Sequence, residues 1–213
     1  TYREAGFNKL LALRGDVPVE RKSDRQAFID SGAFRYANEL VAFIKERGGF
    51  HIFVACYPEG HPEASSLQTD LDNFMRKVEA GADVAITQYF YNNAAYFSFV
   101  EEARRLGATI PIVVGMMPVA PYEQVLRFSE KCDADIPLWI RKRMVGYQDD
   151  LQSQIDFGVE VAVQQAEELL KNGAPGIHFY TLNRADVTAR VCERLLRQNL
   201  GFGISWKEFA YGQ

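Results

Sequence analysis

Residues that can bind ligands or move protons stand where apolar, strand-like runs of this sequence end. The segment Arg14–Asp16 (Arg-Gly-Asp) closes the first run, Tyr57 lies near the end of the second with His61 just after it, and Gln88 lies at the end of the third. Functional residues of β/α proteins gather at strand ends, where charged groups can hold an anion or stabilise a reacting group. Taken singly, such residues have ordinary explanations. Residues 14–16 could form a turn, His61 could be a surface histidine, and Lys77, on the helix that follows, could be a solvated charge.

Five apolar runs must position these residues, and helical-looking sequence separates each run from the next. The runs are Leu10–Asp16, His51–Glu59, Ala82–Phe90, Pro111–Pro118 and Gly176–Arg184. This alternation predicts a parallel α/β sheet. An open dinucleotide-binding sheet usually carries a glycine-rich turn after its first strand, and neither G-x-G-x-x-G nor G-x-x-x-x-G-K-[ST] occurs here. Barrel-type β/α units are therefore favoured, although five strands are too few to close an eight-stranded barrel.

Apolar residues recur at helical spacing between and after these runs. The predicted helices are Phe34–Ile44, Leu67–Val78, Tyr96–Leu106, a segment after Pro121 that includes Val125–Phe128, then Ile136–Val145, Ile155–Leu170 and Ala185–Arg197. The sequence shows no internal repeat, low-complexity tract or linker. We therefore expect one domain over residues 1–200, with residues 201–213 packed against it as an apolar tail.

Composition restricts the class of protein. The net charge of −4 argues against nucleic acid as the main partner, because phosphate backbones need a basic surface. The longest apolar stretch, Ile110–Val119, is shorter than the ~20 residues of a membrane-spanning helix, and no signal peptide is visible. Three cysteines without a C-x-x-C pair predict thiols in a reducing, cytoplasmic compartment. The three histidines lack metal-ligand spacing, so no metal site is expected.

Five segments in this order carry a more specific signal: LALRGD, CYPEGHPEA, KVEAGADVAITQYF, GMMPV and GIHFYTLNR. Together they strongly resemble the methylenetetrahydrofolate reductase family, in near-continuous register from Leu10 to Arg194. The resemblance implies a (β/α)8 TIM-type barrel that holds FAD at its C-terminal face. It also implies an enzyme of one-carbon metabolism: NADH or NADPH reduces the flavin, which then reduces 5,10-methylenetetrahydrofolate to 5-methyltetrahydrofolate in a ping-pong scheme.

The resemblance assigns roles to individual residues. Implied contacts to FAD fall on Arg14, Gly15, Asp16, Tyr36, Ala37, Ala55, Tyr57, His61, Asp70, Lys77, Ile86, Gln88 and Tyr180. Arg14, His61 and Lys77 would donate charge-assisted hydrogen bonds to the ribityl and pyrophosphate oxygens. Gly15 would let the backbone approach the flavin ring closely. Asp16 is the implied catalytic residue, because its carboxylate near the ring would favour the cationic 5-iminium form of the folate.

Implied contacts to the folate substrate fall on Gln88, Gln124, Phe128 and Arg184. The i, i+4 spacing of Gln124 and Phe128 places both on one helix face, although Phe128 could equally belong to the core. Gln88 would read the edge of the pterin ring, and the guanidinium of Arg184 would bind the glutamate tail.

The match also implies what the chain lacks. The five runs resemble the family's fourth to eighth strands, so only the last five β/α units are expected. The family's catalytic glutamate and its N-terminal histidine that contacts FAD would then have no counterpart. The open edges of a partial barrel predict instability or self-association, and because the family forms oligomers we expect a homo-oligomer. The alternative to an active reductase is a truncated, non-catalytic flavin- and folate-binding remnant.

Overall fold

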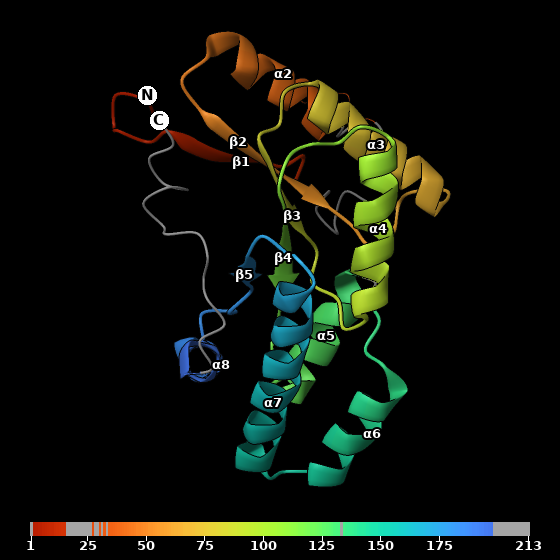
Figure 1. The fold of residues 1–213 in the computed structure, drawn as a ribbon, viewed down its shortest axis with the longest axis vertical. Coiled ribbons are helices and arrows are strands. Elements are labelled where there is room, and N and C mark those ends of the chain that lie inside the picture. Colours follow the sequence, from red (N-terminus) through yellow and green to blue (C-terminus); the bar gives the residue numbers. More distant parts are fainter. Residues whose placement is uncertain are drawn as a thin grey trace. The chain divides into compact units, whose positions relative to one another are not determined.

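The computed structural model describes residues 2–15, 27, 30, 32, 34–132 and 134–197 (Figure 1). Two expectations from the sequence fall outside these residues: the catalytic role of Asp16 and the packing of the tail at 201–213. Within the described part of the chain, no helix combines the length and hydropathy that crossing a bilayer requires.

The fold is α/β, with five parallel strands that follow one another in both sequence and sheet order (Figure 1). The strands are β1 (Lys9–Ala12), β2 (His51–Cys56), β3 (Val84–Thr87), β4 (Ile112–Met116) and β5 (Ile177–Phe179). Four of them lie inside one of the apolar runs, and β1 begins one residue before its run at Lys9, so the predicted strand order is confirmed. The residues after each strand leave the sheet at its C-terminal edge, where the sequence places its candidate site residues.

Helices follow the strands as the apolar periodicity predicts. They are α2 (Ala37–Arg47), α3 (Leu67–Glu79), α4 (Asn93–Arg105), α5 (Tyr122–Cys132), α6 (Leu138–Tyr147), α7 (Leu151–Lys171) and α8 (Ala185–Arg197). The largest difference is at α7, which begins four residues before the predicted Ile155. Asp150 caps that end: its side chain accepts a hydrogen bond from the backbone N–H of Ser153 at 3.0 Å. The short polar stretch before the apolar stripe is thereby helical.

The chain folds as two compact units. The first unit lies within residues 1–88 and 94–113, and the second within residues 89–93 and 114–213. In the first unit, β2 contributes the fully buried Ile52 and Val54, and the rings of Phe74 on α3 and Phe99 on α4 pack with centroids 5.2 Å apart. Burial of these apolar side chains is the main stabilising contribution to this unit.

The core of the second unit gathers side chains from the segments after β3 and β4, from α5, α6 and α7, and from the connection between α5 and α6: Tyr89, Met117, Val119, Val125, Ala134, Ile136, Ile140, Met144 and Val161. Helix α7 approaches the connection after β4 closely at Gly158. A Cβ atom at this glycine would lie 2.9 Å from the Cβ of Ala120. The side-chain amide of Gln165, also on α7, donates to the carbonyl of Phe90 at 2.7 Å. These contacts hold α7 against the loop after β4.

Candidate functional site

The loop after β2 presents a histidine in a defined protonation state. The backbone N–H of Glu63 donates to Nδ1 of His61 at 3.0 Å. Since that nitrogen accepts, the neutral imidazole carries its proton on Nε2. Burial lowers the pKa of His61 below its usual value, which favours this neutral form. The ring lies edge-on to Tyr57, with centroids 4.6 Å apart. His61 therefore offers one N–H donor beside a flat aromatic wall.

Helix α3 adds a cation and a carboxylate on one side. Asp70 is only 6% exposed, and Lys77 lies two turns later on the same face. The Lys77 ammonium donates to the carbonyl oxygen of Ala55 at 2.7 Å. Burial lowers the pKa of Lys77 and raises that of Asp70, and the positive charge of Lys77 opposes the second shift. Lys77 is therefore not a solvated surface charge, and the pair can hold a polar ligand.

The loop after β1 reaches the same cluster. An Nη1 nitrogen of Arg14 lies 2.7 Å from a carboxylate oxygen of Glu63. Gly15 has φ +81°, a conformation that side chains rarely adopt, and a Cβ atom there would meet no heavy atom of the described residues within 4 Å. Its predicted contact with the flavin ring stays a prediction. Asp16 follows directly, outside the described residues.

The ends of β2 and β3 bring in two further predicted residues. Ala55 pairs with Ile86 in the parallel ladder, and the backbone N–H of Gln88 donates to the carbonyl of Cys56 at 2.8 Å. Cys56 itself is fully buried, and burial raises the pKa of its thiol to about 12, so it is an unreactive core residue.

In the first unit, then, the contacts above join the predicted residues Arg14, Ala55, Tyr57, His61, Asp70, Lys77, Ile86 and Gln88. The predicted pair Tyr36 and Ala37 lies elsewhere along the chain, at the start of α2, where the Glu39 carboxylate accepts from the backbone N–H groups of Arg35 and Tyr36. Tyr36 is 59% exposed and is not part of these contacts.

The second unit contains a narrow crevice formed by the segments after β4 and β5. Its lining includes Gln124 on α5, Tyr180 after β5 and Arg184 before α8, three of the residues that the sequence predicts. The remaining lining residues are Met117, Pro118, Ala120, Thr181, Leu182, Val187 and Thr188. An amide, a phenol and a guanidinium thus meet in one crevice, which is a suitable set for binding the edge or the acidic end of a ligand.

The turn that forms one wall of this crevice has an unusual backbone. Leu182 and Asn183 both have positive φ, +49° and +61°, and the backbone N–H of Arg184 donates to the carbonyl of Thr181 at 2.8 Å. Left-handed conformations of side-chain-bearing residues are energetically unfavourable, and they concentrate at functional sites. The turn directs the chain so that Arg184 lies in the crevice lining.

Thr188 also lines the crevice, and its hydroxyl oxygen is buried without a hydrogen-bond partner among the described residues. An unsatisfied buried hydroxyl is unfavourable unless something else bonds to it. Sequence reasoning missed this residue, because it lies on α8 beyond the motif that ends at Arg184.

The predicted substrate residue Phe128 lies one turn after Gln124 on α5. It is 36% exposed, so it is not a core side chain, and its ring centroid lies 6.3 Å from that of Tyr89. Tyr89 is buried, and its hydroxyl forms a hydrogen bond with the Ser129 hydroxyl at 3.0 Å; its ring also packs edge-on to Tyr180. Phe128 thus belongs to an aromatic group with Tyr89 and Tyr180, and Tyr180 also lines the crevice.

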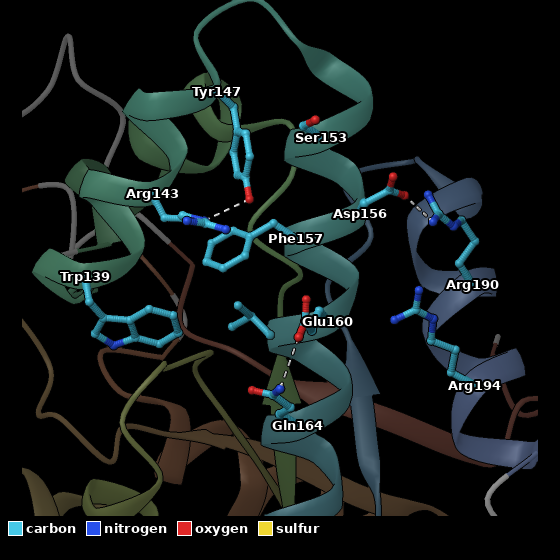
Figure 2. Close-up of a pocket in the computed structure, with 11 residues that line it drawn as sticks. Trp139, Arg143, Tyr147, Ser153, Asp156, Phe157, Glu160, Gln164, Arg190 and Arg194 are labelled. Carbon is cyan, nitrogen blue, oxygen red and sulfur yellow. Dashed lines mark hydrogen bonds and ion pairs between the residues drawn. The ribbon is translucent and has the colours of Figure 1, made fainter.

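A larger hollow of about 730 Å³ lies over α7 between α6 and α8, and Figure 2 shows the residues that line it. Trp139, Tyr147 and Phe157 form its aromatic part, and Arg143 donates to the Tyr147 hydroxyl at 2.9 Å. On the other side Arg190 pairs with Asp156, whose pKa it lowers. None of the sequence-predicted site residues lines this hollow.

Among the described residues, no group of three or more histidine, cysteine, aspartate or glutamate side chains is placed to hold a metal ion.

Comparisons with known proteins place this geometry in a family. A family model described as methylenetetrahydrofolate reductase matches residues 1–196. The 5,10-methylenetetrahydrofolate reductase of Escherichia coli strain K12 is 36% identical over 194 residues, which are 91% of this chain and 62% of that protein. The enzyme of the same name from Pectobacterium carotovorum subsp. carotovorum is 37% identical over 195 residues, again covering 62% of its length. This chain therefore spans about three fifths of the relatives that it matches.

One similar solved structure is described as "Uncharacterized protein from Clostridium thermocellum binds two copies of 5-methyl-5,6,7,8-tetrahydrofolic acid". It is 18% identical and superposes with a TM-score of 0.50, covering 71% of this chain and 55% of that one. At this identity the likeness concerns the fold alone.

Proposed function

Since the chain belongs to the methylenetetrahydrofolate reductase family, we propose that it is the flavin- and folate-binding part of an enzyme that reduces 5,10-methylenetetrahydrofolate to 5-methyltetrahydrofolate. The observation that carries this proposal is the crevice of the second unit. Gln124, Tyr180 and Arg184, which the resemblance had assigned to ligands, line it together with the unsatisfied hydroxyl of Thr188. Because the crevice has room for only about one water molecule, a folate would contact it by its end alone, such as a carboxylate.

The cluster in the first unit fits FAD by the chemistry of its donors and acceptors. Arg14, Lys77 and the Nε2–H of His61 are donors for phosphate and ribityl oxygens, and the buried Asp70 carboxylate accepts from a hydroxyl. Tyr57 supplies a flat amphipathic surface. When bound, FAD would supply hydride transfer from NADH or NADPH to the folate.

The residues of this chain would bind and orient the reactants. In the second unit, Arg184 and Gln124 would hold the acidic end of the folate and Phe128 its aromatic middle. The carboxylate of Asp16 would favour the cationic 5-iminium form of the folate, which accepts hydride more readily. Nicotinamide and folate would use the site in turn. That the Clostridium thermocellum protein is described as binding 5-methyltetrahydrofolic acid supports the choice of ligand.

At the level of the fold, we propose that the five described strands are the last five of a (β/α)8 barrel. The parallel order of β1 to β5 and the greater length of the relatives support this. The free thiols of Cys56 and Cys192 support a reducing, cytoplasmic location. We propose a homo-oligomer because, among the described strands, β1 pairs with β2 alone.

The experiment is to purify the protein, add FAD and record the flavin absorbance as NADH and then 5,10-methylenetetrahydrofolate are supplied anaerobically. Bleaching by NADH, followed by return of absorbance with the folate, supports the reductase. A yellow protein that binds flavin and folate without turnover identifies the second candidate, a non-catalytic remnant. Failure to bind either ligand contradicts both.

A further inference from the structure

We propose that Glu63 is a positioning residue that fixes two ligand-binding groups, Arg14 and His61, in the orientations that the proposed FAD site needs. The inference rests on the proposed function, because FAD is the ligand that both groups would bind. Glu63 itself would not touch the cofactor.

The side chain of Glu63 acts on Arg14. Its carboxylate oxygen lies 2.7 Å from Nη1 of Arg14, and the two side chains are 36% and 22% exposed. The guanidinium also donates from Nε to the carbonyl of Gly15 at 3.2 Å. A guanidinium has five N–H groups in a rigid plane, so two fixed bonds set the direction of the whole fork. The bond to Glu63 joins the loop after β1 to the loop after β2.

The backbone of Glu63 acts on His61. Its N–H donates to Nδ1 at 3.0 Å, which leaves Nε2–H as the donor toward a ligand. Protonation of Nδ1 would place two N–H groups against each other, so this bond also opposes the imidazolium form. The charged groups around the ring are Glu63 and Asp70, which favour protonation, and Arg14 and Lys77, which oppose it.

One residue thus determines both where a guanidinium points and which imidazole nitrogen donates. A surface ion pair of ordinary strength, by contrast, contributes little to stability and fixes no ligand-binding group. A positioning role for Glu63 and an ordinary surface ion pair therefore predict different effects on FAD affinity when the Glu63 carboxylate is removed.

The test uses the whole chain with Glu63→Gln, Glu63→Asp and the control Glu46→Gln, which removes the same charge from the exposed face of α2. Affinity for FAD is measured by quenching of flavin fluorescence. We expect Glu63→Gln to weaken FAD binding about tenfold, as loss of one charge-assisted hydrogen bond in a partly buried site would. Glu63→Asp is too short to reach Arg14 and is expected to bind FAD almost as weakly, whereas Glu46→Gln binds like the unaltered protein.

A second readout does not depend on FAD. ¹⁵N NMR of the His61 imidazole is expected to show the Nε2–H tautomer, and Glu63→Gln is expected to lower the pKa of His61 further, because a negative charge that favours the imidazolium is lost. Glu63→Asp keeps that charge and the pKa. Unchanged FAD affinity in Glu63→Gln, or an Nδ1–H tautomer, overturns the proposal. If the unaltered protein binds no FAD, the proposed function fails, and the NMR measurement still decides the positioning of His61.

Discussion

At the scale of single residues, Thr188 is a position where one substitution is expected to raise stability and weaken ligand binding. Its hydroxyl is buried in the crevice without a partner in the described structure, so Thr188→Val removes an unsatisfied polar atom while keeping the shape. We expect the free energy of unfolding to rise by up to about 1 kcal/mol and the affinity for 5-methyltetrahydrofolate to fall roughly tenfold. Urea unfolding and calorimetric titration measure the two quantities.

Thr188→Ser is the matched control, since it keeps the hydroxyl and should bind like the unaltered chain. A Thr188→Val variant that binds the folate normally would show that the hydroxyl has no part in recognition.

The lowered pKa values of two histidines predict how the stability of the chain depends on pH. Burial lowers the pKa of both His61 and His178 in the folded chain, whereas the unfolded chain has the ordinary value of about 6.5. Below that pH the unfolded state binds more protons than the folded state, so stability is full above pH ~6.5 and falls as the pH is lowered. Urea midpoints between pH 8 and 5 should show this decline.

His61→Gln and His178→Gln should each flatten part of the slope, one in each unit. A slope that survives in the double variant would assign the decline to other groups.

The residue scale is also where sequence reasoning reached its limit. Asp70, Lys77 and His61 could be anticipated only from the family resemblance, which assigns all three to the proposed FAD site. Glu63 stands in the same motif, but its bond to Arg14 joins residues 49 positions apart, and only the pairing of β1 with β2 brings them together. Local spacing carries no information about such a contact.

At the scale of elements, the pattern of apolar residues predicted the strands β1–β5 and the helices α2–α8, because burial of one face determines where each element can lie. It could not predict how closely two elements approach. Gly158 on α7 is an example. In the sequence it is a residue of low helix propensity within a long helix, whereas in the structure it lets Ala120 of the loop after β4 pack closely against α7.

Gly158→Ala is therefore expected to lower stability, against its helix propensity. The added Cβ would lie 2.9 Å from the Cβ of Ala120, and both carbons are attached directly to backbone. Overpacking costs about 1–3 kcal/mol, which exceeds the gain of up to about 1 kcal/mol from replacing a helical glycine. We expect a net loss of about 1 kcal/mol, together with weaker folate binding, because Ala120 also lines the crevice.

Ala120→Gly removes the opposing carbon, so the double variant should lose less stability than the sum of the two single changes. Strict additivity in urea unfolding would show that the two positions do not compete for space.

At the scale of the whole molecule, the position of β1 in the sheet leads us to predict that the chain self-associates in solution. Among the described strands β1 is hydrogen-bonded to β2 alone, and Leu11 and Leu13, on one face of its path, are each 49% exposed. An edge with open backbone groups and exposed leucines is a template for pairing with another chain. We therefore expect concentration-dependent self-association in sedimentation velocity, and we expect Leu11→Lys to reduce it.

Leu106→Lys, which alters a similarly apolar residue just after α4, should leave the association unchanged. Hydrogen exchange gives the decisive comparison, because pairing at the edge protects amides that a lone β1 would expose. If the chain stays monomeric at high concentration while Leu10–Leu13 are fully protected, then β1 is already covered within one molecule, and the partial barrel we propose has no open edge there.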